Sequence, residues 1–121
     1  MPAIYQSAVY TPGDIVAGNA HLLVAIPVTV ASGEIVQRGA VLGKVTATGE
    51  YRLSASAATD GSQTPDAVLA EDVDASGGAT PGLAYIRGDF IAEALTLGAG
   101  HTADGIREGL RGKGIFLIHQ A

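Results

Sequence analysis

Histidine is the residue type in this sequence best suited to bind a metal ion or to transfer a proton. The three histidines, His21, His101 and His119, show no HxH or HxxxH spacing, so the sequence does not place two imidazoles beside one metal ion. Serine and acidic residues are present, but no G-x-S-x-G motif marks a catalytic serine. The sequence therefore predicts neither a metal site nor an enzyme. The alternative is a small barrel enzyme or ligand-binding domain that uses His101 and Asp104.

A glycine-rich segment could in principle bind a nucleotide cofactor. Residues 98–103 read GAGHTA, which matches the GxGxxA form of the dinucleotide fingerprint by spelling. That fingerprint follows a strand in a βαβ unit, whereas a helix-like segment precedes it here. Residues 112–114 (GKG) lack the serine or threonine and the upstream glycine of a phosphate loop. The sequence therefore predicts turns at both places and no cofactor.

Acidic residues gather in the middle of the chain and could supply oxygen ligands to calcium. The five are Asp60, Asp66, Glu71, Asp72 and Asp74. Their spacing does not match an EF-hand loop, which needs acids or amides at its first, third and fifth positions and then a glycine. We therefore interpret them as a solvated acidic edge, which would also discourage unwanted strand pairing.

Low charge is the main feature of the composition. Only 16% of the 121 residues are charged and 17 are glycine, whereas about 25% are charged in typical soluble domains. Such a surface suggests burial in an assembly. The net charge of −5 argues against a nucleic-acid partner, because no basic patch is present to neutralise phosphates. The absence of cysteine excludes disulfides and thiolate sites.

Membrane insertion and export signals are not evident. The most apolar stretch, residues 21–31, contains Pro27 and is too short to span a bilayer. Residues 1–18 include no lysine or arginine and no continuous apolar run, so they do not resemble a signal peptide. We therefore expect no membrane partner, and a product that stays in the cytoplasm of the cell that makes it.

Short strands dominate the expected structure of a single domain over residues 19–121. The strand-like segments are residues 22–30, 35–36, 41–47, 51–54, 67–73, 83–87 and 115–118. Pro27 cannot donate a ladder hydrogen bond, so we expect it on an edge strand or at a bulge. Residues 115–118 (IFLI) are uniformly apolar, which is typical of a buried closing strand.

Two short helices are expected near the C-terminus. Asp89 could cap a helix over residues 90–97, which Gly98 would end. Thr102 could cap a second helix that places Ile106 and Leu110 on its buried face.

Residues 1–18 differ in character from the rest of the chain. Isolated apolar side chains alternate with proline and glycine, a pattern that could pair in an extended form with another surface but could hardly fold alone. A frayed terminus is the alternative. The isolated apolar side chains that we single out are Ile4, Tyr5, Val9, Tyr10 and Ile15.

The order and spacing of these elements resemble the lambda-type bacteriophage head decoration protein family from Tyr10 to Ile118. The resembling stretches are YTPGDIVAG (10–18), IPVTVASGEIVQRGAVLGKV (26–45), YRLSASAATDGSQTPDAVLAEDVDAS (51–76), GDFIAEALTLGAGHT (88–102) and GIFLI (114–118). Each is a plain turn-and-strand pattern, but their full order is specific, above all in ATDGSQTPDAVLAEDVDA.

The resemblance implies a mainly β fold: a β-clip-like small barrel with two short C-terminal helices and an extended N-terminal arm over residues 1–18, disordered in the free protein. It also implies a homotrimer on the outer surface of the expanded phage head. There it would bind the major capsid (coat) protein at three-fold and quasi-three-fold sites and stabilise the capsid against internal DNA pressure. The arm would add a strand to the coat protein, with the five apolar residues named above as contacts. Another phage assembly subunit is the alternative.

Overall fold

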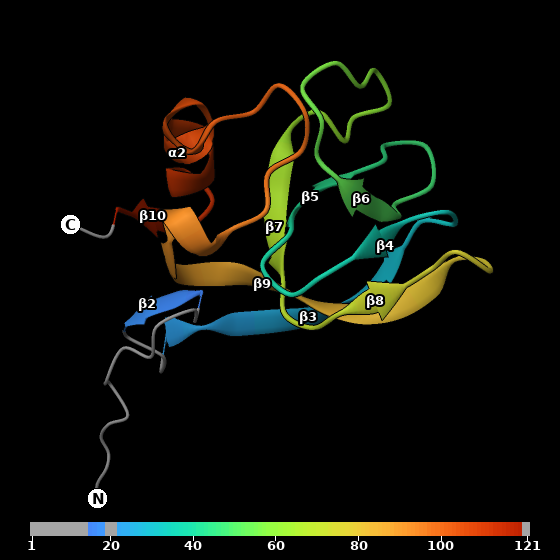
Figure 1. Cartoon of the computed structure of the whole chain (residues 1–121), viewed down its shortest axis with the longest axis horizontal. Coiled ribbons are helices and arrows are strands. Elements are labelled where there is room, and N and C mark those ends of the chain that lie inside the picture. The colour runs from blue at the N-terminus through green and yellow to red at the C-terminus, as the bar shows by residue number, and fades with distance from the viewer. Residues whose placement is uncertain (1–14, 19–21, 120–121) are drawn as a thin grey trace, which may run out of the picture.

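The computed structural model describes residues 15–18 and 22–119, and its main feature is a closed barrel of five strands (Figure 1). The barrel strands are β3 (Val24–Val30), β5 (Val41–Lys44), β6 (Tyr51–Leu53), β7 (Pro65–Leu69) and β9 (Thr80–Ile91). Their order is β9, β3, β6, β5 and β7, and β7 pairs with β9 to close the ring. Only β3 and β6 run parallel, so the barrel is mixed.

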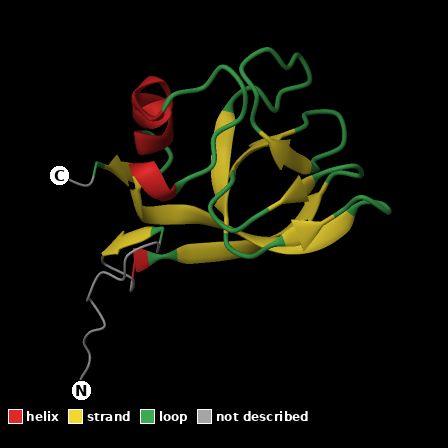
Figure 2. Cartoon of the chain, viewed as in Figure 1, coloured by secondary structure: helices red, strands yellow, loops and turns green. Residues whose placement is uncertain are grey.

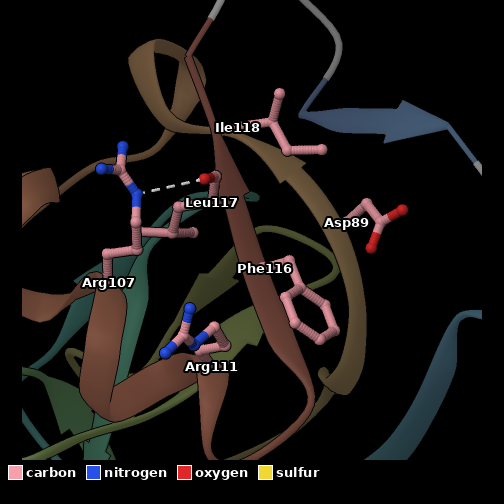
Figure 3. A pocket seen from close by; sticks show the side chains of 6 residues that line it. All are labelled: Asp89, Arg107, Arg111, Phe116, Leu117 and Ile118. Atoms are coloured by element: carbon pink, nitrogen blue, oxygen red, sulfur yellow. Dashed lines mark hydrogen bonds between the residues drawn. The ribbon is translucent and has the colours of Figure 1, made fainter.

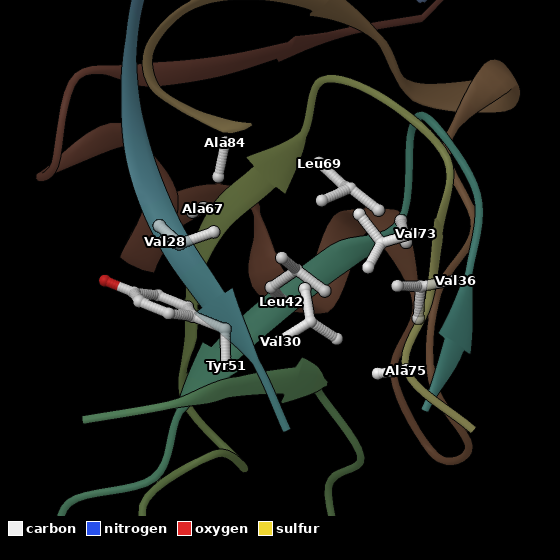
Figure 4. Packing of buried hydrophobic residues seen from close by; sticks show 11 residues of the cluster. Val28, Val30, Val36, Leu42, Tyr51, Ala67, Leu69, Val73, Ala75 and Ala84 are labelled. Atoms are coloured by element: carbon white, nitrogen blue, oxygen red, sulfur yellow. The ribbon is translucent and has the colours of Figure 1, made fainter. Parts of the chain in front are cut away.

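The barrel interior is filled by small and β-branched side chains. The second half of β3 alternates, with Val28 and Val30 buried and Pro27 and Thr29 exposed. Figure 4 shows Leu42, Leu69 and Val73 pointing into the same interior. A barrel of so few strands leaves room only for side chains, which explains the buried alanines at positions 67 and 84. The interior is therefore a packed core and not a ligand cavity.

Pro27 lies where a missing N–H group costs little. Strand β3 pairs with β9 along its whole length but with β6 only at Val30 and Tyr51. Pro27 consequently has no strand on its β6 side. The expectation of an edge position for Pro27 is confirmed.

Strand β9 continues beyond the barrel and organises a second layer. Its last residues pair in parallel with β10 (Ile115–Ile118) on one edge and antiparallel with β2 (Val16–Gly18) on the other. Helix α2 (Ala103–Arg111) packs beside β10 and buries Ile106 and Leu110. Around the buried Phe90, these elements form a second hydrophobic cluster outside the barrel.

Helix α2 begins as the sequence predicts. The Thr102 hydroxyl accepts a hydrogen bond from the Gly105 N–H group at 3.0 Å, which satisfies one of the free donors of the first turn. Figure 2 shows how little helix accompanies the strands. Among the described residues, no helix is long and apolar enough to cross a membrane.

The mainly β class with a small barrel is confirmed, but the first predicted helix is not an α-helix. Within residues 90–97, β9 extends to Ile91, and a single 3-10 turn (η2, Ala92–Ala94) follows. Pairing with β10 and β2 supplies backbone hydrogen bonds on both edges of β9 and buries Phe90. These long-range contacts outweigh the local helix signal. The predicted strand 67–73 is likewise divided, between β7 and a short β8 (Val73–Asp74) that pairs with β4 (Ile35–Val36).

Candidate binding surfaces

His101 has a packing environment and not a catalytic one. Its Nε2 atom lies 3.0 Å from the Gln63 carbonyl oxygen and 3.2 Å from the Ser54 hydroxyl, and Ser54 is fully buried. A carbonyl oxygen only accepts, so Nε2 must carry a proton to bond with Gln63 and cannot then take one from Ser54. A Cβ atom on Gly98 would lie 1.8 Å from the Ser54 carbonyl oxygen, which shows how closely this turn is packed. The geometry does not support an enzyme built on His101.

Asp104 joins a different cluster, which connects α2 with the end of the chain. His119 contacts Glu93 through Nδ1 at 2.6 Å and Asp104 through Nε2 at 2.8 Å, and Asp104 also pairs with Arg107 at 3.0 Å. Both imidazole nitrogens are thus engaged by carboxylates. Within residues 15–18 and 22–119, no three potential ligands converge on a metal site. We call this exposed cluster the C-terminal clasp, because it ties η2 and α2 to the residue that follows β10.

The clasp is expected to stabilise the fold most between about pH 4 and about pH 6.5. Hydrogen bonds to Asp104 and Glu93 raise the pKa of His119 in the folded protein. The stability that His119 contributes is therefore complete below the pKa that it has in the unfolded chain. It is lost as the pH rises through the pKa of His119 in the folded protein. The hydrogen bond from His119 and the charge of Arg107 lower the pKa of Asp104, so that contribution is lost as the pH falls through its folded pKa. The effect is small because the groups are exposed.

Thermal unfolding of the wild type and of His119→Ala checks this expectation. The difference between their unfolding midpoints should be larger at about pH 5.5 than at about pH 8.5. An equal difference at both pH values would show that the imidazolium charge contributes nothing.

The acidic residues in the middle of the chain are used inside the fold. Asp60 and Asp74 accept hydrogen bonds from the N–H groups of Ser62 and Ser76, each two residues further on, as turn-forming aspartates do. Asp66 pairs with Lys113 at 2.9 Å. These carboxylates shape turns and hold segments together.

One exposed surface of the barrel has an uncharged centre, with Lys44 at its margin. It is the outward side of the β3–β9 ladder, where Pro27 faces Leu83 and Thr29 faces Pro81. Leu83 is 41% exposed and lies beside Pro27, so the two contribute apolar surface to this side of the ladder. We call this surface the uncharged face, and it consists of Ala25, Pro27, Thr29, Pro81 and Leu83.

A groove runs along β10. Phe116 and Ile118 point outward, with 43% and 46% of their surfaces exposed, while Ile115 and Leu117 are buried. Figure 3 shows two arginines of α2 on one side of β10 and the side chains of Phe116 and Ile118 on the other. The groove encloses about 460 Å³, and we call it the β10 groove. Its lining residues are Asp89, Arg107, Arg111, Phe116, Leu117 and Ile118.

The prediction from the sequence did not include the exposed half of β10. Residues 115–118 are all apolar, so their pattern could not distinguish a strand buried on both sides from one buried on a single side. The spacing of Arg107 and Arg111 predicted that both lie on the solvent-facing side of the helix, but it did not predict that they line a groove.

Ile15 is a core residue of this chain. It is 3% exposed, and its carbonyl oxygen accepts a hydrogen bond from the Ile91 N–H group at 2.7 Å. The arm expected over residues 1–18 therefore has its last residues, from Ile15 onward, packed on β9. A contact of Ile15 with a coat protein stays a prediction, and it would first require removal of Ile15 from the core. The other four predicted contacts, Ile4, Tyr5, Val9 and Tyr10, lie outside the described residues.

Comparison with known protein families gives a match over most of the chain. The family model described as "Bacteriophage lambda head decoration protein D" matches residues 5–115. No curated protein matches the chain.

Proposed function

The chain belongs to the bacteriophage lambda head decoration protein D family, and we propose that it forms a homotrimer at the three-fold and quasi-three-fold positions of the expanded head. As a member of that family it is a structural head decoration protein of the phage exterior and not an enzyme. We further propose that it binds the major capsid protein and stabilises the capsid against internal DNA pressure. The observation that carries the proposal is the family match over residues 5–115.

The uncharged face supports self-association. Charged residues are depleted from the centres of protein interfaces, and this face has none among its five residues. In a trimer, a surface patch of one copy meets a different patch of the next copy, and the ring closes after three. Pro27 suits such a contact, because a proline limits open-ended strand pairing at this part of β3.

Leu83→Asp is expected to weaken the trimer at least about tenfold, because it would bury an unpaired carboxylate in the subunit contact. Sedimentation velocity over a concentration series measures the change. Ala57→Asp is the matched control, since it adds the same charge at an exposed turn residue of the loop after β6, beside Ala99 and away from the uncharged face. If both variants associate as the wild type does, the uncharged face is not the subunit contact.

The N-terminal segment is proposed as the arm that contacts the coat protein. Strand addition gains affinity from main-chain hydrogen bonds and specificity from alternate side chains, which suits the spaced apolar residues Ile4, Tyr5, Val9 and Tyr10. The arm would leave the domain at Ile15, where β2 is fixed to β9. Three arms on one trimer would bind together, so the whole assembly can bind tightly even if each arm binds weakly.

Co-sedimentation with phage heads tests the proposed function. Purified protein should pellet saturably with expanded heads and should raise their resistance to heat. Unexpanded heads serve as the control. Failure to bind expanded heads of the cognate phage would contradict the proposal.

A further inference from the structure

Strand β10 has an open edge that a side chain partly occupies. Among the described residues β10 pairs with β9 alone. The Gly114 carbonyl oxygen bonds to Gly88 of β9, so by alternation the Leu117 carbonyl points to the opposite edge. There it accepts a hydrogen bond from Arg107 Nε at 3.3 Å. At 3.3 Å this hydrogen bond is long. It occupies the Leu117 carbonyl oxygen, which could instead accept a hydrogen bond from a backbone N–H group of another strand.

The side chains along this edge are not those that protect a free strand. Exposed edges usually carry charged residues or proline, which discourage pairing with another chain. The outward residues of β10 are instead Phe116 and Ile118, both close to half exposed. Burying them against a partner would contribute favourably to binding.

The open edge is also flanked by positive charge in an acidic protein. Arg107 and Arg111 line the β10 groove, and Asp89 is its only acidic lining residue. Arg107 binds Asp104 through Nη1, and Arg111 binds Glu108 through Nη2. A guanidinium has five N–H donors, so each arginine keeps donors that a partner carboxylate can use.

The root of the proposed arm lies close to the groove. Strand β2 pairs with β9 at Phe90 and Asp89 on one edge, and β10 pairs with the same residues on the other. Two strand spacings, roughly 10 Å, separate β2 from β10. A coat subunit that receives the arm would therefore lie next to the groove.

We propose that the β10 groove binds an extended segment of the coat protein that carries aspartate or glutamate. Its backbone pairs with the open edge of β10, its apolar side chains pack on Phe116 and Ile118, and its carboxylate binds Arg107 and Arg111. The inference rests on the proposed function, since the coat protein is the partner. The chain's own arm fits less well: the only carboxylate in residues 1–14 belongs to Asp14, which directly precedes Ile15, and β2 anchors Ile15 to the far edge of β9.

Two groove variants of the full chain test the inference on expanded heads. Arg111→Glu and Phe116→Ser should each weaken binding at least about tenfold, because each removes one of the two kinds of contact. The matched controls are Arg52→Glu and Ile35→Ser, which make the same kinds of change at exposed residues outside both the groove and the uncharged face and should bind within about twofold of the wild type. Thermal unfolding of every variant shows whether it is folded. If Phe116→Ser is not, Arg111→Glu decides, since its side chain lies on the helix surface.

The outcomes separate the inference from the proposed function. If the wild type does not bind heads, the proposed function fails. If the wild type binds and both groove variants bind equally well, the function stands and the inference is overturned. A photo-crosslinking residue at position 116 identifies the occupant directly: an acidic coat peptide supports the inference, whereas crosslinks only to a second copy of this chain overturn it.

Discussion

Deletion of residues 1–14 is expected to weaken binding to expanded heads at least about 100-fold and to leave the domain folded. Three arms act together in the proposed trimer, and their loss removes the gain from multivalent binding as well as each contact. The deletion ends at residue 14 because Ile15 belongs to the core and Val16–Gly18 form β2.

A longer deletion provides the control for this experiment. Removal of residues 1–18 also takes away Ile15 and β2, so it should lower stability as well as binding, whereas removal of 1–14 should lower binding alone. Co-sedimentation measures binding, and urea unfolding measures stability. Wild-type affinity after deletion of residues 1–14 would contradict the arm assignment.

Phe90→Ala is expected to lower the free energy of unfolding by about 3–5 kcal/mol. Phe90 is fully buried where β2, β9 and β10 meet, and its ring centroid lies 5.5 Å from that of Tyr85. Truncation leaves a cavity between the barrel and α2 that the surrounding strands cannot fill. Because small domains are stable by only about 5–15 kcal/mol, the loss is a large part of the total.

Urea unfolding followed by circular dichroism measures this effect, and Phe116→Ala is the matched control. Phe116 is the same residue type on the neighbouring strand, but its side chain points outward. Its truncation should cost less, about 1–2 kcal/mol in the isolated protein, because 43% of Phe116 is already exposed. Similar losses for the two variants would show that the second cluster does not form as described.

The barrel could be predicted from the sequence, whereas the course of β9 could not. The short apolar, β-branched runs and the turn residues between them are local signals, and they indicated a small β-rich domain correctly. Strand β9 runs without a break from Thr80 to Ile91, although residues 90–97 have the composition and capping residue of a helix. Its pairing with β10 and β2 depends on residues far away in the chain, which no local pattern reveals.

The binding surfaces depend on long-range pairing in the same way. Residues 115–118 were predicted as a buried strand, and half of them are buried; the outward half forms the groove. Ile15 has the spacing of an arm residue, but its place beside Gly39 and Ile91 follows only from the fold. The family assignment was accessible from the sequence because it depends on the order of many plain elements and not on one site.

The most direct test is electron cryo-microscopy of expanded heads of the cognate phage, reconstructed with and without added protein. The account predicts new protrusions at every three-fold and quasi-three-fold position, each fitted by three copies of the barrel, with density from the N-terminal residues reaching the coat protein. Heads without added density at these positions, or with single copies bound elsewhere, would contradict it.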